Sequence, residues 1–156
     1  MLSQLARLSV EADGRYATAE ELQFLKEYFQ SCNRRLSAYQ KIKVAEQEII
    51  NQVEAQMQSL DPSLFRRGAT DLTSKWRLDT VRVLRYSAAT LLIDDSERLR
   101  DRFLLWFQTI LGAFQAKTSA KVTYQVMQGV IKQYLTPEEA FLLIPILETN
   151  SMILGK

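Results

Sequence analysis

The stretch KWRLDTVRVLRYSAATLLIDD, residues 75–95, indicates the fold. Apolar side chains in and just before it recur at helical spacing, at Leu72, Trp76, Val83, Leu84, Ala88 and Leu91. The run Asp94-Asp95-Ser96 then favours a helix end and a cap for the next helix. The sequence therefore predicts a helix from about Asp71 to Ile93.

The residues before this stretch also follow helical spacing. A short helix is expected over residues 2–12, and a second from about Ala19, because Thr18 and Glu21 form a T-x-x-E capping box. We expect this second helix to loosen near residues 31–33. The longest apolar stripe follows, at Ile42, Ala45, Ile49, Val53, Met57 and Leu60. It predicts a core helix that ends at Asp61-Pro62.

The residues after the opening stretch predict three more helices, which makes seven in all. They are expected over residues 97–114 and 119–134 and from Pro137 onwards, and an exposed loop that holds Arg66 and Arg67 precedes the helix over residues 71–93. The last one starts at a second capping box, Thr136 with Glu139, and should kink or end early at Pro145. Short connections between helices predict an all-α, globin-like or bundle architecture.

Composition is consistent with one globular domain spanning 1–156. The 156 residues are 47% hydrophobic and 24% charged, with five scattered glycines and no segment that reads as a linker. Twenty basic and 18 acidic residues leave a net charge of +2, so nucleic acid is not an expected partner. No apolar run approaches the length of a membrane span, so we expect a cytoplasmic protein that does not insert into membranes.

The chain lacks histidine, which argues against most catalytic chemistry. Without His there is no Ser-His-Asp triad, no Cys-His pair and no histidine-ligated haem. The single Cys32 cannot form an internal disulfide or a thiolate zinc site, and no metal site is expected. The acidic pairs lie at predicted helix starts, where capping explains them. We therefore expect a protein that is not an enzyme.

Two groups of residues resemble the phycobiliprotein (phycobilisome protein) family, the globin-like antenna subunits that include those of allophycocyanin and phycocyanin. The N-terminal group is Asp13, Arg15, Tyr16, Thr18, Glu21, Leu22 and then Arg35-Leu36. The middle group follows the family's chromophore helix without gaps, at Asp79, Leu84-Arg85 and Asp94-Asp95. The resemblance implies an N-terminal helical hairpin, residues 1–32, followed by a globin-like bundle.

The same register departs from the family where the pigment would be attached. Trp76 stands in place of the cysteine that forms a thioether to a linear tetrapyrrole, so no covalent cofactor is expected. The resemblance leaves a site for a tetrapyrrole such as phycocyanobilin held without a covalent bond, at Trp76, Arg77, Asp79 and Arg85. In the plainer interpretation, Asp79 pairs with Arg82 along the helix and Trp76 fills the volume of a bilin ring.

The resemblance also implies an interaction surface, because the family's N-terminal helices pack against a partner subunit. The candidate interface residues are Leu5, Leu8, Tyr16, Leu22, Leu25 and Phe29. They would be exposed in a monomer, and exposed apolar patches mark interfaces. We expect a dimer, with a second copy or with another phycobiliprotein-like subunit.

Three functions follow as hypotheses. The first is a phycobiliprotein-like protein without covalent pigment that acts by protein–protein interaction in phycobilisome assembly, regulation or light-harvesting antenna attachment at the thylakoid surface of a cyanobacterial cell. The second is a soluble carrier or sensor that holds a bilin non-covalently. The third is a globin-like regulatory domain without a ligand.

Overall fold

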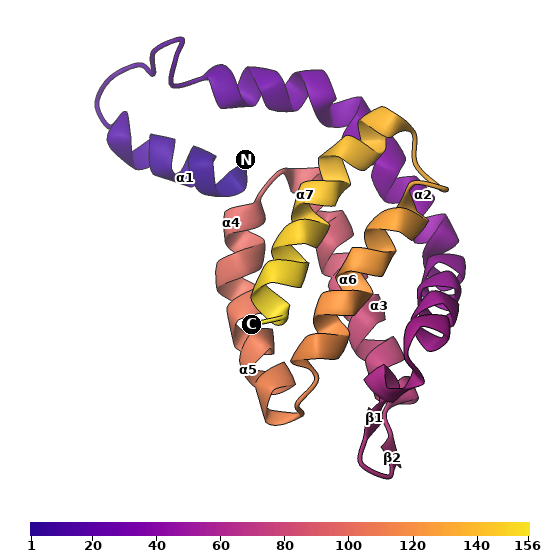
Figure 1. Ribbon diagram of the computed structural model, residues 1–156. Helices are drawn as coiled ribbons and strands as arrows, with labels where there is room; N and C mark the ends of the chain where they lie inside the picture. Colours follow the sequence, from indigo (N-terminus) through magenta and orange to yellow (C-terminus); the bar gives the residue numbers. More distant parts are fainter.

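The computed structural model describes residues 1–156 and is built almost entirely of helices (Figure 1). The helices are α1 (Leu2–Glu11), α2 (Gln23–Leu60), α3 (Thr73–Ile93), α4 (Ser96–Leu99), α5 (Leu105–Ala113), α6 (Lys117–Ile131) and α7 (Pro137–Leu154). The all-α prediction is therefore confirmed, and the globin-like arrangement agrees with the resemblance. No helix is both long and apolar enough to cross a membrane.

The core lies where α2, α3, α6 and α7 pack together. Four members of the predicted apolar stripe of α2 are buried, at Ile42, Ile49, Val53 and Met57, whereas Ala45 is half-buried and Leu60, at the helix end, is exposed. The main apolar partners of this stripe come from α3, α6 and α7, including Val83, Leu91, Met127, Val130, Leu143 and Leu147. These side chains belong to one cluster of 28 buried residues. Burial of this cluster is the main stabilising term of the fold.

Helix α2 is continuous, so the expected loosening near residues 31–33 is wrong. Arg35 explains why, since its buried guanidinium donates to the Ser31 Oγ at 2.8 Å and to the Leu91 carbonyl at 2.7 Å. It also lies 3.1 Å from the Asp94 carboxylate. These contacts bind the first half of α2 to the end of α3, and so the polar residues that suggested a break support the helix.

The predicted start of α2 is also early by four residues. Thr18 and Glu21 do form both hydrogen bonds of a capping box, at 2.8 and 3.2 Å. The backbone turns through residues 18–22, however, and the helix begins only at Gln23. Arg15 stabilises this turn with an ion pair of 2.7 Å to Glu21.

The expected loop after α2 contains a small hairpin. A 3₁₀ turn over Pro62–Phe65 leads into β1 (Arg66–Arg67), which pairs antiparallel with β2 (Thr70–Asp71). Gly68 has a φ of +58° in the connecting turn, a conformation that glycine adopts at little cost. Both arginines are exposed, as expected, and the hairpin projects from one end of the bundle (Figure 1).

The helix expected over residues 97–114 contains a π-helical turn, Arg100–Leu104, between α4 and α5. The wider turn places Phe103 and Phe107 in the core. Their rings stack at 5.3 Å, and Tyr86 of α3 stacks on Phe103 at 4.2 Å. An aromatic stack thus joins α3 to the π-turn and α5.

Helix α7 does not end early at Pro145. It starts at the predicted capping box, Thr136 with Glu139, and continues to Leu154. Pro145 lies on the exposed side of the helix, where loss of one backbone donor costs least. Burial of Leu147 and Leu154 beyond the proline favours continuation.

Helix α1 and the first turns of α2 stand apart from the bundle (Figure 1). Polar contacts fasten α1 to the start of α4: Ser3 N and Oγ donate to Asp95 at 2.7 and 2.8 Å, and Arg7 pairs with Glu97 at 2.9 Å. Burial raises the pKa of Asp95, but the bonds from Ser3 and from the Arg98 backbone outweigh burial and lower it overall. An ionised Asp95 therefore both caps α4 and holds α1.

Candidate functional site

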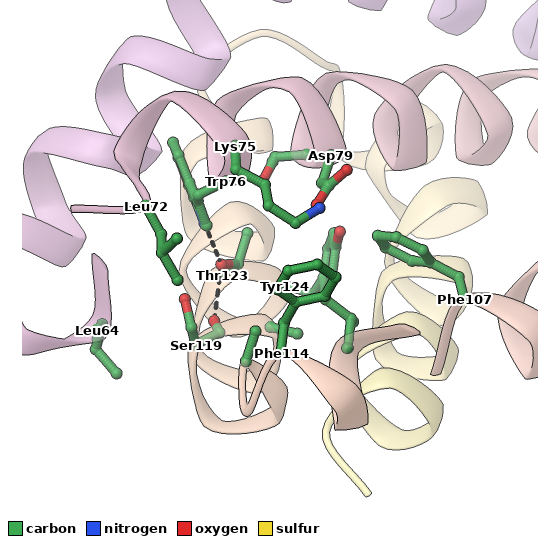
Figure 2. A pocket seen from close by; sticks show the side chains of 14 residues that line it. Leu64, Leu72, Lys75, Trp76, Asp79, Phe107, Phe114, Ser119, Thr123 and Tyr124 are labelled. Atoms are coloured by element: carbon green, nitrogen blue, oxygen red, sulfur yellow. Dashed lines mark hydrogen bonds and ion pairs between the residues drawn. The ribbon is translucent and has the colours of Figure 1, made fainter. Parts of the chain in front are cut away.

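A cavity of about 50 Å³ lies between α3, α5 and α6, and two of the four residues that were expected to hold a bilin line it (Figure 2). Helix α3 provides Trp76 and Asp79, which the helical spacing directs to the same side. Helix α5 contributes Phe107, and α6 contributes Thr123 and Tyr124. The cavity is mostly apolar, with these few polar groups directed into it.

Trp76 forms a buried part of the wall of this cavity. Its side chain is 9% exposed, and its ring packs edge-on against Phe65 at 5.0 Å. The indole N–H donates to Thr123 Oγ1 at 2.8 Å, and Thr123 in turn donates to the Ser119 carbonyl at 2.8 Å (Figure 2). A buried indole whose N–H is satisfied is a stable core group.

Asp79 faces the same cavity and is bound to Lys75, not to Arg82 as expected. The Lys75 ammonium lies 2.8 Å from the Asp79 carboxylate and 4.7 Å from the centre of the Phe114 ring. Tyr124 is buried beside them, and burial together with the negative charge of Asp79 raises the pKa of its phenol, which stays neutral. The charged groups of the cavity are thus the Lys75–Asp79 ion pair, which lies beside a neutral phenol.

The two arginines predicted for this site lie elsewhere. Arg77 turns towards α2, where its guanidinium contacts Glu54 and Asn51. Arg85 binds Glu46 of α2 through two hydrogen bonds of 2.6 and 2.7 Å. The structure therefore brings Trp76 and Asp79 together, while the arginines join α3 to α2.

The sequence analysis missed the other residues that form the cavity. Lys75 precedes Asp79 by four residues, and that spacing alone was sufficient to indicate their ion pair. The main contributions from other helices are Phe107, Phe114, Ser119, Thr123 and Tyr124. Nothing local in the sequence connects these to α3. The structure also contains no cluster of residues that could hold a metal ion.

The candidate interface residues do not all lie on the surface. Tyr16 and Phe29 are widely exposed, and Leu5 and Leu22 are partly so. Leu25 is half-buried and Leu8 is buried within its own chain, so the expectation of an exposed Leu8 is wrong. The exposed residues lie in the segment that stands apart from the bundle.

A family model described as phycobilisome protein matches residues 8–152. The chain belongs to the phycobilisome protein family. Phycobiliproteins are structural light-harvesting proteins, and they associate with one another in phycobilisomes. A search of curated proteins finds no match to this phycobilisome protein.

Proposed function

We propose that this phycobilisome protein carries no pigment and acts through protein–protein contact, in the assembly, regulation or attachment of the antenna at the thylakoid surface. The observation that carries the proposal is a buried Trp76 beside a cavity of only about 50 Å³. Trp76 occupies the region where the family's pigment-attaching side chain would stand, and its indole is fixed by Thr123 and Phe65. On this proposal the chain keeps the family fold, and a buried indole stands in place of an attached pigment.

The remaining volume supports this proposal. Small-molecule pockets have volumes of roughly 300–1,000 Å³, whereas this cavity has about 50 Å³. That space suits about one or two water molecules, not a linear tetrapyrrole. Tyr124 and Phe107 line the cavity from α6 and α5, and both are buried, so a bilin would need more space than these packed aromatic side chains leave.

The bonding chemistry supports it as well. A thioether requires a thiol, and Trp76 has none. The only cysteine, Cys32, lies on α2 and is not among the cavity residues. Asp79 is the one carboxylate that faces the cavity, and Lys75 already neutralises it. A bilin would have to compete with that ion pair.

An absorption titration with phycocyanobilin tests the absence of pigment. We expect no saturable, red-shifted band for the wild-type protein, because the indole fills the site. Trp76→Cys removes the indole and supplies a thiol, so this variant should gain a band that persists after denaturation. A saturable band in the wild type that Asp79→Ala abolishes would contradict the proposal and support a non-covalent bilin carrier.

The proposed protein–protein contact involves Phe29 and its exposed neighbours. Phe29 is 69% exposed on the segment outside the bundle. We expect sedimentation to show a dimer, or a complex with an added phycobiliprotein subunit, and Phe29→Ser to weaken that association at least tenfold. Phe141→Ser is the matched control, since Phe141 is 76% exposed but lies on α7. A monomer at high micromolar concentration that binds no such subunit would contradict this prediction.

A further inference from the structure

Two open hollows lie beside α3 at Arg85, one of the two arginines that were expected to serve a pigment. The first, of about 420 Å³, lies between α2 and α3 and includes Lys43, Glu46 and Arg85. The second, of about 500 Å³, lies along α3 and includes Leu78, Arg82, Arg85 and Tyr86. Arg85 lines both hollows, and we call the surface that they form together along α3 the α3 groove.

The α3 groove carries more positive charge than its own residues neutralise. Its charged residues are Lys43, Arg82, Arg85 and Glu46. Glu46 is bound by Arg85, whose side chain remains 67% exposed in that pair. Lys43 and Arg82 have no ion-pair partner in the protein. The groove thus presents two cations without counter-charges.

The position of Arg82 makes this imbalance unusual. Asp79 is three residues away on the same helix, yet Asp79 is bound to Lys75 and faces the cavity. The charged residue that follows Arg82 on the same face is Arg85, whose counter-charge is Glu46. An anion bound from outside would supply the counter-charge that Arg82 lacks.

Apolar surface accompanies these charges. Leu78 and Tyr86 lie one turn on either side of Arg82, and both are exposed. The Tyr86 ring is held by its stack on Phe103, so little side-chain entropy is lost when a partner covers it. Arginine and tyrosine dominate the binding energy of protein interfaces.

We propose that the α3 groove binds an acidic segment of a partner protein, with carboxylates placed against Arg82 and Lys43 and an apolar side chain placed against Leu78 and Tyr86. The charge complementarity favours an acidic occupant and disfavours a symmetric pairing of two copies groove to groove, because both grooves would present the same sign of charge. This surface is separate from the N-terminal segment that the proposed function uses, so the two can be tested independently.

Selection from a random peptide library on the folded full-length protein tests the proposal, with Arg82→Ala and Arg67→Ala as paired variants. Arg67 is an exposed arginine on the β hairpin, outside the groove. We expect the enriched peptides to combine Asp or Glu with Leu, Phe or Tyr. Their affinity should fall about tenfold with Arg82→Ala, fall further at high salt, and stay unchanged with Arg67→Ala.

Three results would overturn the proposal. One is enrichment of peptides without acidic residues, and another is equal weakening by Arg67→Ala and Arg82→Ala. The third is that no peptide depends on Arg82, including the case in which none is enriched. Sedimentation of both variants tests whether the groove instead binds a second copy of the chain. That alternative would be supported if Arg82→Ala changed self-association but left peptide binding unchanged.

Discussion

Trp76→Ala is expected to lower the free energy of unfolding by about 3–5 kcal/mol, the usual cost of truncating a buried tryptophan. The indole is 9% exposed and packs on Phe65, so its loss leaves a cavity that the surrounding helices cannot fill. Thr123 still donates to the Ser119 carbonyl, and no buried donor is left without a partner there. Since small proteins have total stabilities of about 5–15 kcal/mol, urea denaturation should show a large shift in midpoint.

The protein supplies its own control, because it has one other tryptophan. Trp106 is 56% exposed on α5, and Trp106→Ala should cost less than about 1 kcal/mol. Trp76→Phe should fall between the two, since a smaller ring keeps part of the contact with Phe65. Equal costs for Trp76→Ala and Trp106→Ala would contradict the view that Trp76 fills the site.

Ligand rescue separates a filled site from a general loss of packing. Trp76→Gly leaves an apolar space with the shape of an indole, and dry apolar cavities bind small aromatic molecules. Added indole should therefore raise the melting temperature of this variant and leave that of the wild type unchanged. An equal response of the two proteins would contradict a specific cavity.

The parts of the fold that the sequence predicts best are those set by local contacts. The capping box of Thr136 and Glu139 forms within four residues, and the helix starts there as predicted. The same motif at Thr18 and Glu21 forms its bonds but closes only a turn, because helix continuation depends on what the next residues pack against. Capping geometry is local, whereas helix length is not.

Long-range contacts explain the wrong predictions. The sequence around Ser31 is polar and suggested a break, but Arg35 binds the Leu91 carbonyl, 56 residues away. No pattern within α2 contains that information. The candidate site shows the same division: the helix register placed Trp76 and Asp79 on one face, whereas Thr123 and Tyr124 reach them only because α6 packs on α3.

Glu139 is the second position where a single change should have a large effect, because it joins α7 to α2. Its side chain is 5% exposed, and it accepts hydrogen bonds from Lys41 at 2.8 Å, Ser37 at 2.7 Å and the Thr136 backbone at 2.8 Å. Burial raises the pKa of Glu139, but these donors outweigh it and bring the pKa to about 2. We expect Glu139→Gln to lower the free energy of unfolding by about 2–3 kcal/mol at neutral pH, since bonds to a charged group are lost.

The pH dependence distinguishes this role of Glu139 from simple packing. The folded pKa lies below the value of about 4.3 for an unfolded glutamate, so the carboxylate stabilises the fold fully above that pH. As the pH falls from about 5 towards 2, Glu139 becomes protonated and its contribution is lost. The difference in stability between the wild type and Glu139→Gln should therefore shrink over this range in urea denaturation.

The neighbouring Glu138 is exposed, so Glu138→Gln is the matched control and should leave the midpoint at neutral pH nearly unchanged. A difference between the wild type and Glu139→Gln that stays constant with pH, or an equal loss in Glu138→Gln, would contradict the assignment.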